Sequence, residues 1–299
     1  MDANPFYHNL DAVLDHFDDV CAWFKSMGFP YAQTRYGAYQ RLFRELKDRV
    51  SAAKSEDALR ELKERFENAY LEINEIIRVH SDLSKLGTEQ FRKQMKKVIS
   101  GQELRNQASG DSARDFLFEL TIACRFLRTG LPVSLLGICD SVVTLRDGRT
   151  LFVECKRTRS HKKILTNVSE ANKQITKRLS NHHVQTSIGM VAINVTDVMD
   201  KSHFLAPDSP AAATSIHQLQ LHALIAKYPA MQEKRGHDRC LGILTESARV
   251  FYLSKRSPVQ GLIYSRHATF IPYGGPESAI GQELSDLAPV ISNQDIVTG

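Results

Sequence analysis

Residues 140–157 read DSVVTLRDGRTLFVECKR and carry the strongest local structural signal in the chain. Two runs rich in apolar and β-branched residues, 140–146 and 149–157, flank the pair Asp147-Gly148. An Asp-Gly pair between two such runs is typical of a tight β-hairpin. We therefore expect two antiparallel strands joined at Asp147-Gly148.

The second strand of this hairpin ends in charged residues. Glu154 and Lys156 are separated by one residue, so on a strand their side chains lie on the same face. Cys155 then points to the opposite side, where we expect a small core residue. A carboxylate and an ammonium that follow the apolar run 151–153 indicate a functional site; a salt-bridged pair on an edge strand is the alternative.

The position of Asp140 depends on how the hairpin is paired. A two-residue loop pairs Asp140 with Cys155 and Ser141 with Glu154. Opposed residues share a face, so Asp140 would then point away from Glu154. A bulge or a bend at the start of the strand would be needed to bring the two carboxylates together.

The chain around the hairpin has a mixed α/β pattern. Following the rules for helix and strand periodicity, we expect a helix over 112–129, an extended piece over 132–138, a helix over 167–181, a strand over 187–195, a helix over 213–228 and strands over 241–245 and 249–253. Residues from 274 onward are weakly patterned.

Residues 1–100 are predicted to be helical, including segments 8–26 and 36–50. A heptad seam is formed by Leu59, Leu62, Phe66, Ala69, Ile73 and Ile76. At about two and a half heptads the seam is shorter than true coiled coils require, so a helical hairpin or bundle with its own core is favoured over a self-associating coiled coil. The Gly- and Ser-containing stretch 100–111 marks a boundary. We expect a helical domain over 1–108, an α/β domain over 109–275 and a C-terminal tail over 276–299.

The order of these features resembles the PD-(D/E)xK nuclease superfamily, which has the restriction-endonuclease-like fold. The resemblance covers residues 112–200 and differs from the motif in having Cys139, where the name-giving proline would stand. It implies a mixed sheet flanked by helices and a Mg²⁺ ion, with Mn²⁺ as a substitute. The implied roles are metal binding by Asp140, Glu154 and the backbone carbonyl of Cys155, water activation by Lys156, and supporting positions at Glu119 in the preceding helix and Gln174 in the following one.

A concentration of positive charge begins at Lys156. The chain as a whole has a net charge of only +5, yet residues 156–178 contain eight Lys or Arg and one acid, a net charge of +7. The proposed nucleic-acid contacts are Arg157, Arg159, Lys162, Lys163, Lys173, Lys177 and Arg178. A basic loop and helix beside a metal site are suited to binding a phosphate backbone; a solvated basic face is the alternative.

Composition excludes several other classes of protein. With 42% hydrophobic and 24% charged residues, the chain is not disordered as a whole. Its five cysteines form no CxxC pair, which argues against a disulfide scaffold or a zinc knuckle and favours a reducing, cytoplasmic compartment. The first 20 residues have five Asp and no Lys or Arg, unlike a signal peptide, and the most apolar stretch, 188–195, is too short to span a membrane.

These observations predict a metal-dependent nuclease that hydrolyses phosphodiester bonds, of DNA rather than RNA, in restriction, antiviral defence or repair. The helical domain is expected to form a homodimer or to bind a partner protein. The alternative is a nucleic-acid-binding or partner-activated effector subunit that has a nuclease-like fold and does not cleave by itself.

Overall fold

The computed structural model describes residues 10–104, 112–135, 140–181, 187–200, 206–233, 236–254 and 261–292. The helices are α1 (Leu10–Ser26), α2 (Arg35–Arg44), α3 (Leu46–Ala52), α4 (Glu56–Leu83), α5 (Glu89–Ile99), α6 (Ala113–Leu127), α7 (Ile164–Asn181), α8 (Pro210–Ala226), α9 (Ala230–Glu233) and α10 (Ala279–Ser292), with short 3-10 turns η1 (Tyr31–Gln33), η2 (His161–Lys163) and η3 (Thr196–Val198). The strands are β1 (Val133–Ser134), β2 (Ser141–Thr144), β3 (Thr150–Arg157), β4 (Ser187–Asn194), β5 (Cys240–Tyr252) and β6 (Leu262–Pro272).

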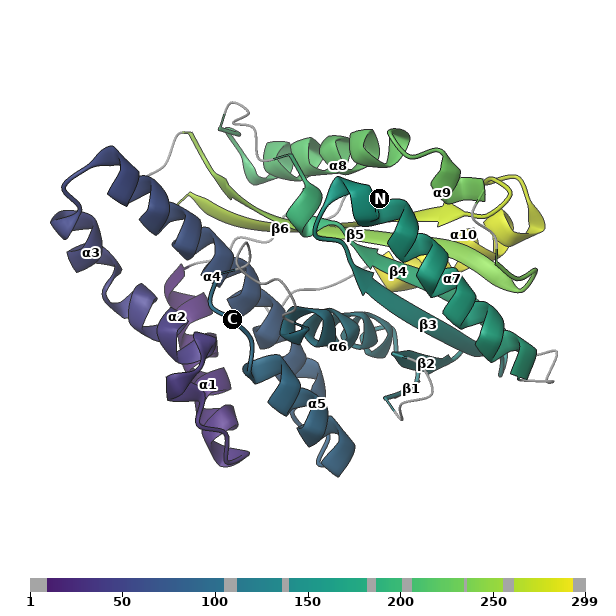
Figure 1. The fold of residues 1–299 in the computed structure, drawn as a ribbon, viewed down its shortest axis with the longest axis horizontal. Helices are drawn as coiled ribbons and strands as arrows, with labels where there is room; N and C mark the ends of the chain where they lie inside the picture. The colour runs from purple at the N-terminus through teal and green to yellow at the C-terminus, as the bar shows by residue number, and fades with distance from the viewer. Residues whose placement is uncertain are drawn as a thin grey trace.

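The six strands form one mixed sheet in the order β1-β2-β3-β4-β5-β6. β2 is antiparallel to both β1 and β3, β3, β4 and β5 run parallel, and β6 returns antiparallel to β5. Helix α7 connects β3 to β4, and α8 and α9 connect β4 to β5 (Figure 1). The predicted α/β class, with a mixed sheet flanked by helices, is confirmed.

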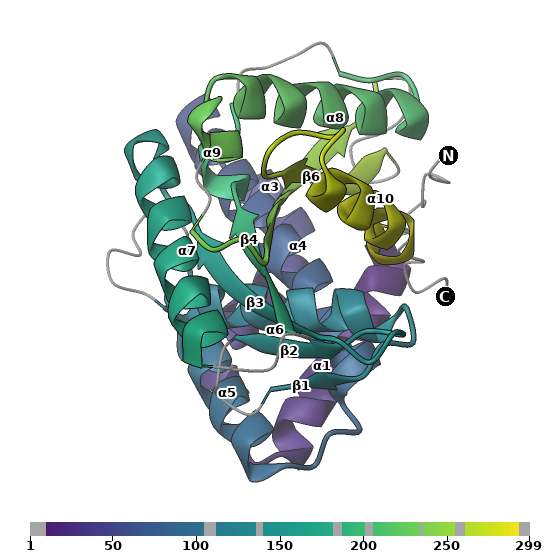
Figure 2. The ribbon, with the colours of Figure 1, turned by 90° about the vertical axis from the view of Figure 1, so that its right-hand side faces the viewer.

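Successive side chains of the central strands point alternately to the two faces of the sheet. On β3, Phe152 packs with residues of α7 and α8, whereas Leu151 and Val153 pack with residues of α6 and α10. Figure 2 shows α7, α8 and α9 on one side of the sheet and α6 and α10 on the other. Because both faces are covered, any charged side chain on β3 lies in or beside a core.

The N-terminal helices pack against α6, against the last residues of β5 and against the first residues of β6 (Figure 1). In the heptad seam of α4, Phe66, Ala69, Ile73 and Ile76 are at most 6% exposed, whereas Leu59 near the start of the helix is 42% exposed. Most of the seam therefore packs within this chain, in a core that it shares with α6.

Three features of the C-terminal part differ from the prediction or were not predicted. The two short strands expected over 241–245 and 249–253 are one strand, β5. Glu246, a charged residue, lies between the two expected segments, but its carboxylate is buried between Arg125 of α6 and Arg266 of β6, at 2.5 and 2.7 Å, and the strand continues through it. Strand β6, which is polar at its centre, and helix α10 had no corresponding prediction.

The described cysteines at positions 21, 124, 155 and 240 are all buried thiols, and Cys139 lies outside the described residues. Within the described ranges, no helix has the length and apolar character needed to cross a membrane.

Candidate active site

The loop of the β2–β3 hairpin is one residue longer than expected. The N–H of Leu145 donates to the carbonyl of Arg149 at 2.8 Å, and the N–H of Gly148 donates to the carbonyl of Leu145 at 3.0 Å. Residues 146–148 therefore form the loop, and Gly148 has a φ of +84°. Three-residue hairpin loops commonly end in such a left-handed residue, which glycine adopts without strain. The expectation of a two-residue loop is wrong.

The longer loop changes which residues face each other. Ser141 lies opposite Val153, and the same register continued by one position brings Asp140 opposite Glu154. Opposed residues share a face, so this register directs Asp140, which stands in a bend just before β2, to the side of Glu154, and no bulge within β2 is needed. The N–H of Cys155 donates to Oδ2 of Asp140 at 2.6 Å, which holds the Asp140 carboxylate against the end of β3.

Glu154 lies between β3 and α7. It is 1% exposed, and its Oε1 accepts a hydrogen bond from Nε of Arg178, which α7 contributes. Lys156, two residues further along β3, is half-buried on the same face. The side chain of Cys155 points the other way, into the core beside α6, as predicted.

Glu119 is half-buried on α6 and lies within electrostatic reach of the hairpin carboxylates. Burial, together with the negative charges of Asp140 and Asp115 and against the effect of Lys156, raises the pKa of Glu119 to about 8. Burial also raises the pKa of Glu154 to about 6, with Asp140 as the second cause. Burial likewise raises the pKa of Asp140. The charge of Asp140 thus disfavours the ionisation of both Glu119 and Glu154.

The arrangement offers a divalent cation few protein ligands. Among the residues that the structure describes, no group of three or more His, Cys, Asp or Glu side chains is arranged to hold a metal ion. Mg²⁺, however, usually keeps several waters and takes only one or two carboxylates from a protein. Asp140 and Glu154 supply two such carboxylates, and the repulsion between them is what a cation would relieve. The residues present therefore fit Mg²⁺.

Gln174, the predicted supporting residue of the following helix, is exposed on α7. It lies one helical turn before Arg178, so the two residues share a side of the helix. Since Arg178 contacts Glu154, that side of α7 faces the carboxylates of the β2–β3 hairpin, which we call the hairpin site. The structure gives Gln174 no contact with the carboxylates themselves.

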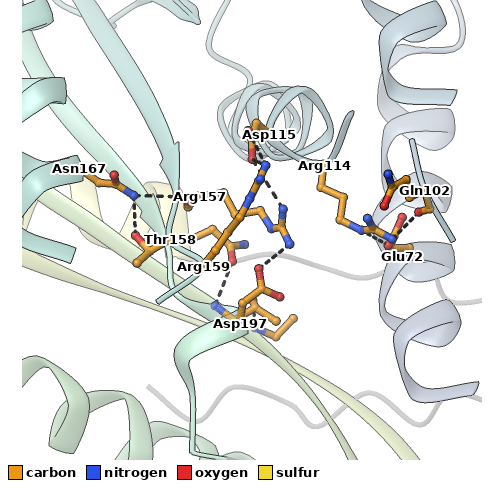
Figure 3. A network of polar contacts seen from close by, with 12 residues as sticks. Glu72, Gln102, Arg114, Asp115, Arg157, Thr158, Arg159, Asn167 and Asp197 are labelled. Carbon is orange, nitrogen blue, oxygen red and sulfur yellow. Dashed lines mark hydrogen bonds and ion pairs between the residues drawn. The ribbon is translucent and has the colours of Figure 1, made fainter. Parts of the chain in front are cut away.

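The predicted nucleic-acid contacts separate into two groups. The first group consists of arginines that are engaged within the protein. Arg157 is buried between Asp115 of α6 and Asp197 after β4, at 3.7 and 2.5 Å, and Arg159 pairs with Asp115 at 3.0 Å (Figure 3). With a side chain only 2% exposed, Arg157 cannot reach a phosphate in solvent in this conformation.

The second group consists of lysines that point into solvent. Lys162 and Lys163 lie in η2, and Lys173 and Lys177 lie on α7; all four are exposed. Lys162 lies six residues after Lys156. Lys173 and Lys177 lie on the same helix as Arg178. The charge available to an external anion therefore comes from these lysines.

Two contacts of the site were not predicted from the sequence. Arg178, predicted as a nucleic-acid contact, pairs with Glu154. Asp115 was not singled out, although it lies one turn before Glu119 and pairs with both Arg157 and Arg159. Helical spacing was the available signal, because Arg178 lies four residues after Gln174 and Asp115 lies four residues before Glu119.

Comparison with known proteins adds no assignment, because no family model, curated protein or solved structure matches this chain.

Proposed function

We propose that this chain is a Mg²⁺-dependent nuclease with a restriction-endonuclease-like fold that hydrolyses phosphodiester bonds of DNA. The observation that carries the proposal is the Asp140 carboxylate held by the N–H of Cys155 at the end of β3, within electrostatic reach of Glu154, with Lys156 on the same face as Glu154. The order of elements around the hairpin, from α6 through β2, β3 and α7 to β4, agrees with the resemblance seen in the sequence.

Each residue has a distinct role in the proposed chemistry. Asp140 and Glu154 would hold the cation, with the backbone carbonyl of Cys155 and, after ionisation, Glu119 as further oxygen ligands. The bound cation would supply charge neutralisation at the phosphate and a lowered pKa for a bound water. Lys156 would, in its neutral form, accept the proton of the attacking water, or, as an ammonium, orient that water and stabilise the negative charge that develops on the phosphate.

The four exposed lysines, at positions 162, 163, 173 and 177, support a polyanionic substrate. Lysines that contact phosphates favour binding without reading base sequence, and their contribution weakens as salt concentration rises. No aromatic side chain is interleaved among them in 156–178, which argues against base stacking as the main mode of binding.

The test is a cleavage assay with wild-type and Glu154→Ala protein. Supercoiled plasmid, linear duplex, single-stranded DNA and RNA would each be incubated with Mg²⁺, Mn²⁺ or EDTA. We expect wild-type protein to degrade DNA only with a divalent cation and Glu154→Ala protein to be inactive. Equal cleavage by both proteins, or cleavage in EDTA, would overturn the proposed site.

A partner-activated effector is the second candidate. It is favoured by the position of α6, which carries Glu119 and is packed directly against the N-terminal helices. A partner that moves these helices would act on the helix that carries a site carboxylate. Wild-type protein that binds DNA and Mg²⁺ but cleaves no substrate alone would favour this candidate.

A further inference from the structure

A guanidinium already occupies one oxygen of the proposed metal-binding pair. Nε of Arg178 bonds to Oε1 of Glu154, and the two side chains are 27% and 1% exposed. Arg178 therefore reaches from the surface of α7 down to a carboxylate in the interior. Asp140 repels Glu154 and Lys156 attracts it. Glu119 of α6 also lies within electrostatic reach of Glu154.

The guanidinium and a divalent cation would compete at Glu154. A buried carboxylate requires a counter-charge, and Arg178 provides one in the absence of metal. A cation bound between Asp140 and Glu154 would supply that counter-charge instead and would repel the guanidinium. Arg178 would then lose its electrostatic partner.

The surface of α7 offers a second anion for the released guanidinium. Arg178 follows Lys177 directly and lies just over one turn beyond Lys173, and both lysines are exposed. These lysines are the proposed phosphate contacts. Arginine binds phosphate well because its planar fork matches two phosphate oxygens. A partly exposed arginine at this position could reach a phosphate by a change of side-chain rotamer alone.

We propose that Arg178 is an exchangeable counter-ion, which neutralises Glu154 in the metal-free protein and transfers to a nucleic-acid phosphate when a divalent cation is bound. This inference rests on the proposed nuclease function. The cation and the nucleic acid each take one member of the same ion pair, so each should strengthen the binding of the other. Such coupling is reciprocal and commonly about 5- to 150-fold.

The experiment measures binding, so it does not depend on turnover. Mn²⁺ affinity without DNA would be followed by electron paramagnetic resonance, and affinity for a duplex oligonucleotide would be measured with Ca²⁺ and with EDTA. We expect Ca²⁺ to strengthen DNA binding by wild-type protein at least about fivefold. In Arg178→Gln, we expect Mn²⁺ to bind more tightly than in wild type and the effect of Ca²⁺ on DNA binding to be largely lost.

Two further variants make the result specific. Arg178→Lys keeps the charge, so we expect it to restore most of the coupling. Arg49→Gln removes an exposed Arg–Glu pair on α3, and it should leave both affinities unchanged. Weaker Mn²⁺ binding by Arg178→Gln would mean that Arg178 only orients Glu154, and it would overturn the inference, as would unchanged coupling. Absence of any cation binding by wild-type protein would instead overturn the proposed function.

Discussion

Individual residues of the hairpin site differ in what they can contribute, because their surroundings differ. Glu154 is buried and paired, whereas Lys156 is half-buried and follows it on the same face. Glu119, with a pKa raised to about 8 by burial and neighbouring carboxylates, is largely protonated at neutral pH when no cation is present. Lys156 therefore stands beside carboxyl groups of mixed protonation, where an ammonium can bind either a carboxylate or a phosphate oxygen.

Lys156→Ala should abolish or strongly reduce cleavage while leaving binding intact. A positioned acid–base group contributes about 10²–10⁴ to a rate, so we expect kcat to fall by at least about 100-fold. Lys163→Ala, which removes an exposed positive charge of η2, should weaken DNA binding and its salt dependence without changing kcat. Single-turnover cleavage at saturating protein separates the two effects, and full activity of Lys156→Ala protein would eliminate the proposed role.

At the scale of elements, the sequence predicted the hairpin but not its register. Val142 and Val143 are both apolar, so the first strand gives no clear alternation by itself. The register follows from burial, because Val143 lies opposite Leu151 and both are fully buried beside α6. A one-residue slip would move Val143 to the opposite face of the sheet. The same burial that selects the three-residue loop brings Asp140 to Glu154.

Other parts of the site could not be read from the sequence, because they depend on packing between distant segments. The pairing of Arg178 with Glu154 requires α7 to lie along β3, and the burial of Arg157 requires α6 and the end of β4 to meet there. Local charge density predicted a basic surface for all these residues. Only the three-dimensional arrangement separates the engaged arginines from the exposed lysines.

Gly148→Ala should destabilise the protein modestly. Gly148 has φ of +84°, and no atom lies within 4 Å of where its Cβ would be, so only backbone strain opposes the change. A left-handed conformation costs a residue with a side chain about 1–2 kcal/mol. We expect urea denaturation to show a loss of about that size. Gly87→Ala is the matched control, since that site is equally open and Gly87 lacks a positive φ; an equal loss there would contradict the explanation.

Helix α8 is joined to the sheet by a buried histidine. His217 is fully buried, with Nδ1 at 2.8 Å from Oγ of Ser265 on β6 and Nε2 at 2.7 Å from Oγ of Ser247 on β5. Burial holds the pKa of His217 well below its ordinary value, and His267 and Arg249 nearby lower it further. The folded protein therefore keeps this imidazole neutral when the unfolded chain would protonate it.

This difference predicts a pH-dependent stability. Below a pH of about 6.5 the unfolded state takes up a proton at His217 and the folded state does not. Stability contributed by the neutral imidazole is therefore complete above that pH and falls as pH decreases. Between about pH 6 and 5, the slope of unfolding free energy should be smaller in His217→Gln than in wild type by about 1.4 kcal/mol per pH unit. Urea denaturation in EDTA would measure it, and parallel curves for the two proteins would contradict the assignment.

At the scale of the whole molecule, α6 joins the helical region to the sheet. Two adjacent residues near its start point in different directions: Arg114 contacts Glu72 of α4, and Asp115 contacts Arg157 and Arg159 (Figure 3). The core of the N-terminal helices also includes side chains of α6, β5 and β6. The helical region and the sheet therefore share both a core and a charged contact, within about one turn of Glu119.

Glu72→Gln should destabilise the entire protein and not only its N-terminal part. Glu72 has no exposed surface, and its carboxylate accepts hydrogen bonds from Arg114 and from Arg35, the latter at 2.7 Å. Removal of its charge leaves two buried guanidinium groups without this counter-ion, and breaking a buried pair in this way costs about 3–5 kcal/mol. Asp57→Asn is the matched control, because its pair with Arg60 is exposed and such pairs contribute less than about 1 kcal/mol.

Guanidinium denaturation followed by circular dichroism and by the fluorescence of Trp23 would report on the whole chain and on the helical region, respectively. We expect one coincident transition shifted to lower denaturant for Glu72→Gln. A separate early loss of the Trp23 signal would show that the helices unfold independently of the sheet, and it would contradict the coupling through α6.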